Sequence, residues 1–491
     1  MPAPIAIFFD FNLPNATTWL YFSFLLAMAL FFKFSRLLSV RNLDVCMIFL
    51  LVPGMLIVQN ARPQPVAVEE SPALQVASLI GKNALPTLGV ERLADGDHLT
   101  RQCGRTLENA RWLWTGYLWL MVGSIYFFCR CLFDLALVQR PLLGPNLQIG
   151  GMAWLAGAMM ICMLAVAYRQ AERYLNPVFP TASHPMPILL LHPADQSIFA
   201  VAVLWWDWPA WAVTGLALLC HCAVAVGLAW MGWRHYQDLS AGIAAATLYL
   251  LLPYTSLSVG LIHHVLPMVL FLATLLAYRR PTLAGCLLGI TTAATYFPLF
   301  TLPLWLSFYR DRGLGRFLIA FLISLAAVLG FIAALLWAHG ELDSSIQTAL
   351  DSAAWQPWKV PTTEGFWTGV HWAYRIPVFL LFMSFVVGTM FWPVPKNVAH
   401  VIALSAAIFV GVQWWSADQG GLYMTWYVPL LMLMIFRPNL QDRVPPPIDA
   451  ETDWLIGARR GLARALRRLL NRQELIRDNK QNQISESHRS P

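Results

Sequence analysis

The chain has 491 residues, of which 58% are hydrophobic and 12% are charged, whereas about a quarter of the residues in soluble domains are charged. This composition excludes an ordinary water-soluble enzyme and predicts a polytopic membrane protein. The formal net charge of +7 does not indicate nucleic-acid binding, because the basic residues gather in short corners between apolar runs and in the C-terminal tail.

Long apolar runs recur along most of the chain, and each is close to the roughly 20 residues that cross a hydrocarbon core of ~30 Å. No stretch alternates apolar and polar residues as a membrane β-barrel would. The sequence therefore predicts an all-α, polytopic transmembrane helical bundle of about 12–13 spans over residues 1–437. The expected spans are 17–35, 43–59, 112–133, 149–168, 209–232, 239–259, 261–278, 282–308, 317–338, 374–393, 398–416 and 421–436.

Basic residues near the ends of these spans give the expected orientation, because cytoplasmic corners are enriched in Lys and Arg. The basic corners hold Lys33, Arg36, Arg41, Arg130, Arg140, Arg234, Arg279, Arg280, Arg310, Arg312, Arg316 and Lys396. If all of them are cytoplasmic, the N-terminus lies outside and the C-terminus inside. The large external loops are then 60–111, 169–208 and 339–373.

This orientation closes only if the segment 282–308 returns to the side from which it enters. The segment is interrupted by three threonines and by Pro298 and Pro303. It is therefore interpreted as two half-helices or a re-entrant hairpin, since broken backbone is tolerated in a membrane where it lines protein or a cavity. The alternative is one tilted helix with proline kinks and a miscounted segment elsewhere.

The last part of the chain, 438–491, is expected to be a cytoplasmic basic tail. Within it, residues 453–476 place leucines and alanines on one helical face and arginines on the other. This pattern predicts an amphipathic helix that lies on anionic lipids of the inner leaflet.

Two groups of polar residues near span ends are candidates for a site. His263 and His264 occupy an expected external corner, and polar groups at the lip of a bundle often mark functional cavities, although a solvated turn would look the same. Asp207 lies among tryptophans at a membrane boundary, where it would serve as a desolvated base or as a helix N-cap. Pro209 favours the cap.

No metal-binding or nucleotide-binding pattern is present. The chain lacks a phosphate-binding P-loop, an H-E-x-x-H motif and paired C-x-x-C motifs. The C-x-C pairs at Cys129/Cys131 and Cys220/Cys222 lie within apolar helices, where neighbours two apart face different directions. We therefore expect no cofactor and no metal; a divalent ion is compatible with the chemistry below but has no support.

The stretch 260–316 carries a resemblance to a known family. Its features are Gly260 to His264, the pair Arg279 and Arg280, the small residues Ala284, Gly285 and Gly289, the run Tyr296-Phe297-Pro298, and the basic corner from Arg310 to Arg316. The last span, with Trp426-Tyr427-Val428-Pro429, fits the same pattern. The chain resembles the multi-spanning GT-C glycosyltransferases, in particular the polyprenol-phosphate-mannose-dependent α-mannosyltransferase-like family (GT87).

The chain departs from that family pattern at two places. His263 and His264 stand where a Gln/Asn pair is expected, and Tyr296 stands where the family usually has a lysine. The second change removes a positive charge that would meet a lipid phosphate. The resemblance therefore describes a divergent member, or one that has lost activity.

The resemblance implies an integral-membrane glycosyltransferase in a bacterial inner membrane. It would transfer a sugar, with mannose suggested by the family, from a polyprenyl-phosphate donor to a lipid or glycan acceptor at the external face. The family's catalytic carboxylate lies in the first large external loop, where this chain offers Asp97 or Asp95, then Glu69 or Glu70. A carboxylate would act as general base, and cations would stabilise the leaving phosphate. The residues expected at the substrate are Arg101, Arg105, His263, His264, Asp207 and Tyr296.

Two other functions fit the same sequence. A transporter or flippase for a lipid-linked or small solute is favoured by the broken segment 282–308, because discontinuous helices build sites at the membrane midplane. Against it, the sequence has no inverted repeat and almost no charge buried mid-span. The third reading is a non-catalytic scaffold that interacts through its basic tail.

Overall fold

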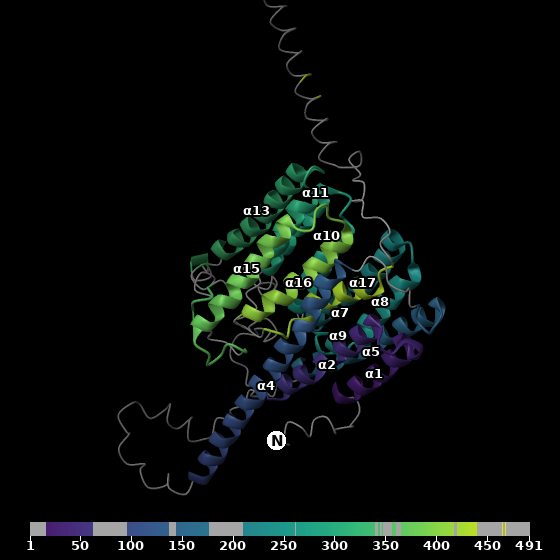
Figure 1. Cartoon of the computed structure of the whole chain (residues 1–491). Helices are drawn as coiled ribbons and strands as arrows, with labels where there is room; N and C mark the ends of the chain where they lie inside the picture. Colours follow the sequence, from purple (N-terminus) through teal and green to yellow (C-terminus); the bar gives the residue numbers. More distant parts are fainter. Residues whose placement is uncertain are drawn as a thin grey trace, which may run out of the picture.

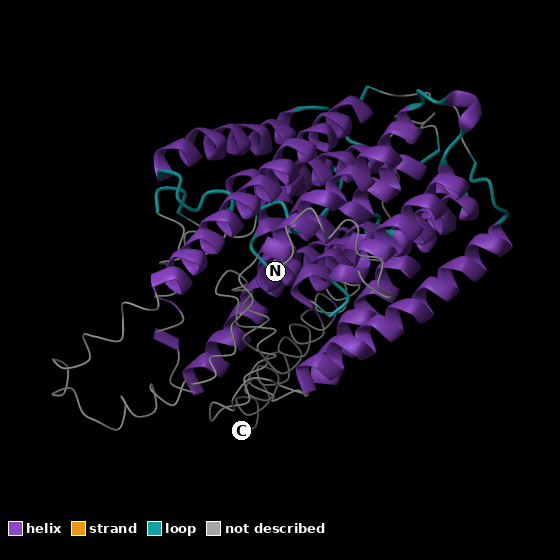
Figure 2. Cartoon of the chain, turned by 90° about the horizontal axis from the view of Figure 1, so that it is seen from below, coloured by secondary structure: helices purple, strands orange, loops and turns teal. Residues whose placement is uncertain are grey.

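The structure is a computed structural model that describes residues 16–61, 96–136, 144–175 and 210–438, together with Arg464 and Arg467. Within the last long range, residues 261, 339–341, 344–345, 347–355, 360–364 and 417–419 are not described. The described residues form helices and connecting loops and contain no strand (Figure 2). The predicted all-α polytopic bundle is confirmed.

The helices run side by side in one bundle, and Figure 1 shows their order. In the first half they are α1 (Ala16–Phe31), η2 (Phe34–Arg36), α2 (Val40–Ala61), α4 (Gly96–Asp134), α5 (Ile149–Leu175), α7 (Ala210–Met231), the π-helical turn η5 (Gly232–Tyr236) and α8 (Leu239–Leu251). In the second half they are α9 (Pro253–Leu257), α10 (Ile262–Leu276), α11 (Pro281–Ala294), η6 (Phe297–Thr301), α12 (Leu302–Phe308), α13 (Leu314–Ala338), η7 (Trp372–Tyr374), α15 (Arg375–Phe391), α16 (Val398–Trp415), η8 (Met424–Trp426) and α17 (Val428–Phe436).

Seven helical segments in the described part are long and apolar enough to cross a membrane. They are Val40–Ala61, Asn109–Asp134, Ile149–Tyr168, Thr214–Tyr236, Leu314–Leu335, Trp372–Phe391 and Val398–Trp415. Large apolar side chains on the outer helices, such as Trp154 on α5, Ile323 on α13 and Leu381 on α15, are exposed. Soluble monomers rarely expose apolar faces of this extent. The chain is therefore an integral membrane protein, with α16 buried at its centre.

The remaining predicted spans are shorter or interrupted. The span 239–259 divides at Leu252, whose backbone is extended, because Pro253 starts the separate helix α9. The predicted span 421–436 contains the nine-residue helix α17, which is about 14 Å long and too short to cross alone. Every residue of α17 is buried. The expectation of a continuous final span is thus wrong, because this half-helix is enclosed by protein.

The boundaries of two predicted loops also change. Helix α4 begins at Gly96, so residues 96–111 are helical instead of belonging to loop 60–111, and Figure 1 shows this end of α4 running past the bundle. Helix α5 continues to Leu175, into the predicted loop 169–208. The predicted amphipathic helix 453–476 lies outside the described residues, apart from Arg464 and Arg467, which are helical.

The segment 281–308 is a re-entrant hairpin. Helix α11 stops at Ala294, Thr295 is extended, and the chain returns through η6 and α12. At the open end of the hairpin the Tyr309 hydroxyl donates to the Tyr278 carbonyl oxygen at 2.7 Å, so the end of the returning arm lies beside its start. The predicted break and return are confirmed. Prolines begin the helical pieces, where their missing N–H costs little.

The hairpin is held against α13 by two glycines. A Cβ on Gly285 would lie 2.2 Å from the Phe317 carbonyl oxygen. A Cβ on Gly289 would lie 2.1 Å from the Ser324 hydroxyl oxygen and 2.5 Å from the Phe321 carbonyl oxygen. The spacing Gly-x-x-x-Gly therefore lets the two backbones approach closely, as small residues do between membrane helices.

Lys396, in the turn between α15 and α16, holds the returning arm of the hairpin. Its ammonium donates to the Ser307 hydroxyl at 2.7 Å and to the Pro393 carbonyl at 2.9 Å. The residue is 1% exposed. Burial lowers the pKa of Lys396 to about 8, because the charged form loses water.

Replacing Gly289 by alanine is expected to destabilise the protein by about 1–3 kcal/mol, because the methyl group would overlap backbone and side-chain atoms of α13. Gly330 on α13 is the matched control, since a Cβ there meets nothing within 4 Å. In thermal unfolding of the detergent-solubilised protein, G289A should have a lower midpoint than wild type. The midpoint of G330A should be unchanged. Equal midpoints for the two variants would contradict the packing argument.

The buried Lys396 predicts a pH-dependent stability. The folded state releases this proton near pH 8, while the unfolded chain keeps it to about pH 10.4. The free energy of unfolding should therefore rise with pH across this window and stay at its lower value below it. Melting midpoints of wild type and of Lys396→Met and Lys396→Arg, measured from pH 7 to 10.5, test this. Neither variant has a group at position 396 that titrates in this pH range, so the melting midpoint of both should lack the rise. An equal rise in the variants and in wild type would rule out Lys396 as its source.

Candidate functional site

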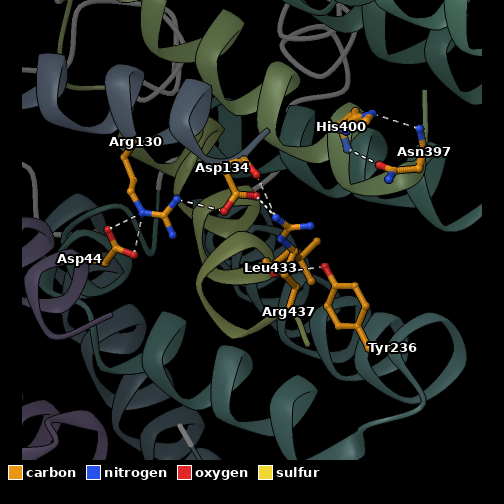
Figure 3. A network of polar contacts seen from close by, with 8 residues as sticks. All are labelled: Asp44, Arg130, Asp134, Tyr236, Asn397, His400, Leu433 and Arg437. Carbon is orange, nitrogen blue, oxygen red and sulfur yellow. Dashed lines mark hydrogen bonds and ion pairs between the residues drawn. The ribbon is translucent and has the colours of Figure 1, made fainter. Parts of the chain in front are cut away.

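A cluster of buried charges joins α2, α4 and the end of α17. The Arg130 guanidinium lies between Asp44 and Asp134, as Figure 3 shows. Its Nε donates to both carboxylate oxygens of Asp44 at 3.0 and 3.1 Å, and its Nη1 donates to Asp134 at 3.0 Å. Arg437 reaches the other oxygen of Asp134 at 2.5 Å and its backbone carbonyl at 3.1 Å. We call these four residues the ion cluster.

The local sequence places the members of the ion cluster. Arg130 and Asp134 are one helical turn apart on α4, which is the spacing at which side chains meet. Asp44 is in the first turns of α2, and the Tyr126 hydroxyl also donates to it at 2.8 Å. Arg437 directly follows α17. The cluster therefore ties three helix ends together.

All four charges are buried, with 5% exposure for Arg130 and 2% for Asp134. Burying ions is costly unless each is paired and hydrogen-bonded. The cluster meets this requirement with two cations and two carboxylates. Its members consequently depend on one another, and the loss of one leaves a buried charge without its full set of partners.

A cavity of about 810 Å³ opens beside the ion cluster. Its walls come from η2 and the start of α2, the last turn of α4, the start of α8 and the end of α17. Asp238 at its edge caps α8 by accepting from the Ala241 amide at 3.0 Å. The surface of the cavity is more apolar than polar, and arginines are its main charged groups. It therefore suits an amphiphile that carries negative charge.

Three of the predicted site residues lie at the other end of α4. Asp97, Arg101 and Arg105 fall within its helical N-terminal part, and nothing is described of their side chains. Their spacing of four places these positions on one face of the helix, at intervals of about 6 Å. Glu69, Glu70, Asp95 and Asp207 lie outside the described residues.

His264 is in the first turn of α10 and is buried, so the solvated-turn alternative does not apply to it. Its ring stacks on Tyr423 with centroids 4.9 Å apart, Tyr423 stacks on Trp426 at 4.1 Å, and Trp426 stacks on Phe297 at 3.6 Å. This aromatic stack connects α10 and η8 to the tip of the hairpin. His263 lies next to it on α10, with its side chain not described.

Tyr296 is at the tip of the hairpin, directly before η6, and is partly buried. Its ring makes edge contacts with Phe297 at 6.5 Å and Phe300 at 6.3 Å. Thus His264 and Tyr296, predicted from the same stretch, belong to one series of ring contacts in which Tyr423, Trp426 and Phe297 stand between them.

The described side chains form no group of three or more His, Cys, Asp and Glu residues that could hold a metal ion. The charged groups that do meet are carboxylate–arginine pairs in the ion cluster. The structure therefore supplies no candidate metal centre within its described part.

Sequence reasoning missed the ion cluster. We expected almost no charge buried mid-span, and the ion cluster does not contradict this, because Asp44 is in the first turns of α2 and Arg130 and Asp134 are in the last turns of α4. The spacing of Arg130 and Asp134 was a readable signal. The pairing of Asp134 with Arg437 joins residues 303 positions apart, and no local pattern predicts it.

Comparison with known proteins gives no assignment. No family model matches the chain, and no curated protein and no solved structure matches it either.

Replacing Asp134 by asparagine should destabilise the protein by about 3–5 kcal/mol, because both arginines lose a buried charged partner. Asp238→Asn is the matched control, since asparagine caps a helix as well as aspartate does. Thermal unfolding in detergent measures both.

The combination of Asp134→Asn with Arg437→Gln should recover part of the loss, because one unpaired cation is removed with its partner. A double variant that is as unstable as the sum of the two single variants would show that Asp134 and Arg437 do not interact.

Proposed function

We propose that the chain is an integral-membrane glycosyltransferase that transfers a sugar from a polyprenyl-phosphate donor to an acceptor at the external face. Two features support this function. The stretch 260–316 resembles a family with that activity, and positions 97, 101 and 105 share one face of helix α4 by their spacing. The observation that carries the proposal is the register of Asp97, Arg101 and Arg105 in α4.

The proposed chemistry needs a base and a cation near one another. Asp97 accepts the proton of the acceptor hydroxyl, the acceptor oxygen bonds to the sugar's anomeric carbon, and the bond from that carbon to the phosphate oxygen breaks. Polyprenyl phosphate leaves, and its negative charge is stabilised by Arg101 and Arg105. These residues precede the apolar part of α4, which starts at Asn109. The register therefore provides the required charges just beyond a membrane-spanning segment.

The re-entrant hairpin supports the same function. Its residues carry the family resemblance, and a helix pair that ends inside a bundle is suited to holding a lipid-linked substrate at membrane depth. Tyr296 at the tip lacks the positive charge that the family has there. A buried cation is nonetheless close, because Arg375 lies over the Trp415 ring at 5.7 Å and Trp415 contacts Phe300 of the tip at 5.8 Å.

A transporter for a lipid-linked or small solute is the second candidate. The hairpin is a discontinuous element of the kind that builds transport sites. The bundle also buries charge in the ion cluster, although at helix ends. The two functions differ in chemistry, since a transporter moves its substrate without breaking the bond between sugar and phosphate.

The function is tested with purified protein in lipid, incubated with radiolabelled polyprenyl-phosphate sugars and an acceptor extract. We expect one donor to release polyprenyl phosphate. Asp97→Asn should lower that rate by about 10²–10⁴-fold, which is the usual contribution of a general base. Arg101→Gln and Arg105→Gln should lower it as well, through lost stabilisation of the leaving phosphate.

Asp311→Asn is the matched control. Asp311 is exposed in the corner after α12 and has a backbone φ of 64°, which asparagine also tolerates. Its turnover should equal that of wild type. Full activity of Asp97→Asn would move the base to Asp95, Glu69 or Glu70. If no donor releases polyprenyl phosphate, the proposed glycosyltransferase activity is overturned. Movement of the donor across the bilayer would then be measured to test the transporter.

A further inference from the structure

The cavity beside the ion cluster combines positive charge with apolar walls. Its charged lining consists of Arg36, Arg41, Arg130, Arg437, Asp44 and Asp238. Four arginines thus face two aspartates. Asp134 also pairs with Arg130 and Arg437, although it does not line the cavity. Even when its carboxylate is counted, the arginines of this group outnumber the aspartates. An occupant with negative charge is favoured over a neutral or cationic one.

The positive groups are held in place by their neighbours. Arg130 is fixed between two carboxylates, and the Arg41 guanidinium lies 4.5 Å above the centre of the Phe436 ring. Arg41 is 9% exposed and lines the cavity from the first turn of α2. The cavity is therefore a built site in which buried arginines present charge from fixed positions.

The mouth of the cavity is apolar. Phe34, Leu37 and Leu38 line it from the connection between α1 and α2 and are largely exposed. The exposed Arg36 lies among them. A surface of this kind suits a molecule that has an anionic head and a hydrocarbon chain, because each part then meets its complement.

The cavity also lies at the basic end of the bundle. Around it are Lys33, whose ammonium bonds Asn146 at 2.6 Å, and the turn η5, whose His235 bonds the Tyr278 hydroxyl at 2.8 Å next to Arg279. Basic ends of membrane bundles face the leaflet that is rich in anionic lipids. The cavity and its expected ligand are thus on the same side.

We propose that this cavity binds the phosphate headgroup of an anionic phospholipid, with Arg36 and Arg41 at the headgroup and Phe34, Leu37 and Leu38 along its acyl chain. The site is separate from the proposed catalytic group on α4, which is at the opposite end of that helix. The proposal is independent of the enzyme or transporter assignment.

The proposal is tested by native mass spectrometry of the full chain in detergent, titrated with phosphatidylglycerol or with phosphatidylcholine of the same acyl chains. We expect one phosphatidylglycerol to bind in preference to phosphatidylcholine. Arg36→Gln should weaken phosphatidylglycerol binding by about five-fold, which corresponds to the ~1 kcal/mol that one basic residue contributes near anionic lipid.

Arg310→Gln is the matched control, because Arg310 is also an exposed arginine of the basic end but does not line the cavity. It should bind phosphatidylglycerol as wild type does. Equal binding of the two lipids, or equal weakening by both arginine variants, would overturn the site. Melting midpoints of the two variants check that each is folded.

A second comparison separates a lipid from a soluble anion. Leu38→Ser should weaken phosphatidylglycerol binding, whereas Leu381→Ser on the outer face of α15 should not, since both leucines are exposed but only Leu38 lines the cavity. Millimolar inorganic phosphate should not displace the lipid. Displacement by phosphate, with no effect of Leu38→Ser, would assign the cavity to a free anion and overturn the lipid.

Discussion

The pairing of Arg130 with Asp44 and Asp134 is the constraint on which this end of the bundle depends. A buried guanidinium must keep its carboxylates, so the first turns of α2 and the last turn of α4 are held at one depth. Arg437 adds the end of α17 to the same position. The three helix ends converge on this group of charges, because separating the charges would leave buried ions unpaired. The cavity lies beside them, and the connection between α1 and α2 forms its remaining wall.

The second constraint is that backbone polar groups inside a membrane must be satisfied. This chain breaks its helices at Leu252, at Thr295 and before α17, and each break lies within the protein. At the first break the Thr255 hydroxyl donates to the Tyr249 carbonyl at 2.6 Å, four residues before Pro253, which has no N–H to donate. At this break a side chain therefore replaces a lost helical bond.

Much of the fold was predictable from residue patterns. Apolar length identified the long helices, and the Lys/Arg corners required 282–308 to return, which the bond between Tyr309 and Tyr278 confirms. The spacing of Gly285 and Gly289 could be read from the sequence, but the sequence did not show that these glycines pack against α13. Span length failed for 421–436, because apolar residues that are enclosed by other helices look the same in sequence as residues that face lipid.

The candidate sites were less predictable. His264 and Tyr296 were singled out from one stretch, and the structure joins them only through the rings of Tyr423, Trp426 and Phe297. Helicity of 96–111 was missed because these residues are polar, and a polar helix has no apolar face to indicate it. The ion cluster depends on contacts between distant parts of the chain, such as that of Asp134 with Arg437. Composition and periodicity carry no information about such contacts.

Helix α17 and the turn before it connect the hairpin tip to the ion cluster. At one end Trp426 of η8 stacks on Phe297 of the hairpin tip, and at the other Arg437 joins the ion cluster beside the cavity. Between them lie only nine buried helical residues, and the Tyr236 hydroxyl bonds the Leu433 carbonyl at 3.1 Å along the way. Arg437 and the contact at the hairpin tip are therefore joined by one continuous buried segment. This contact path becomes allosteric only if ligands at the two ends change each other's affinity, because coupling is a free energy and not a distance.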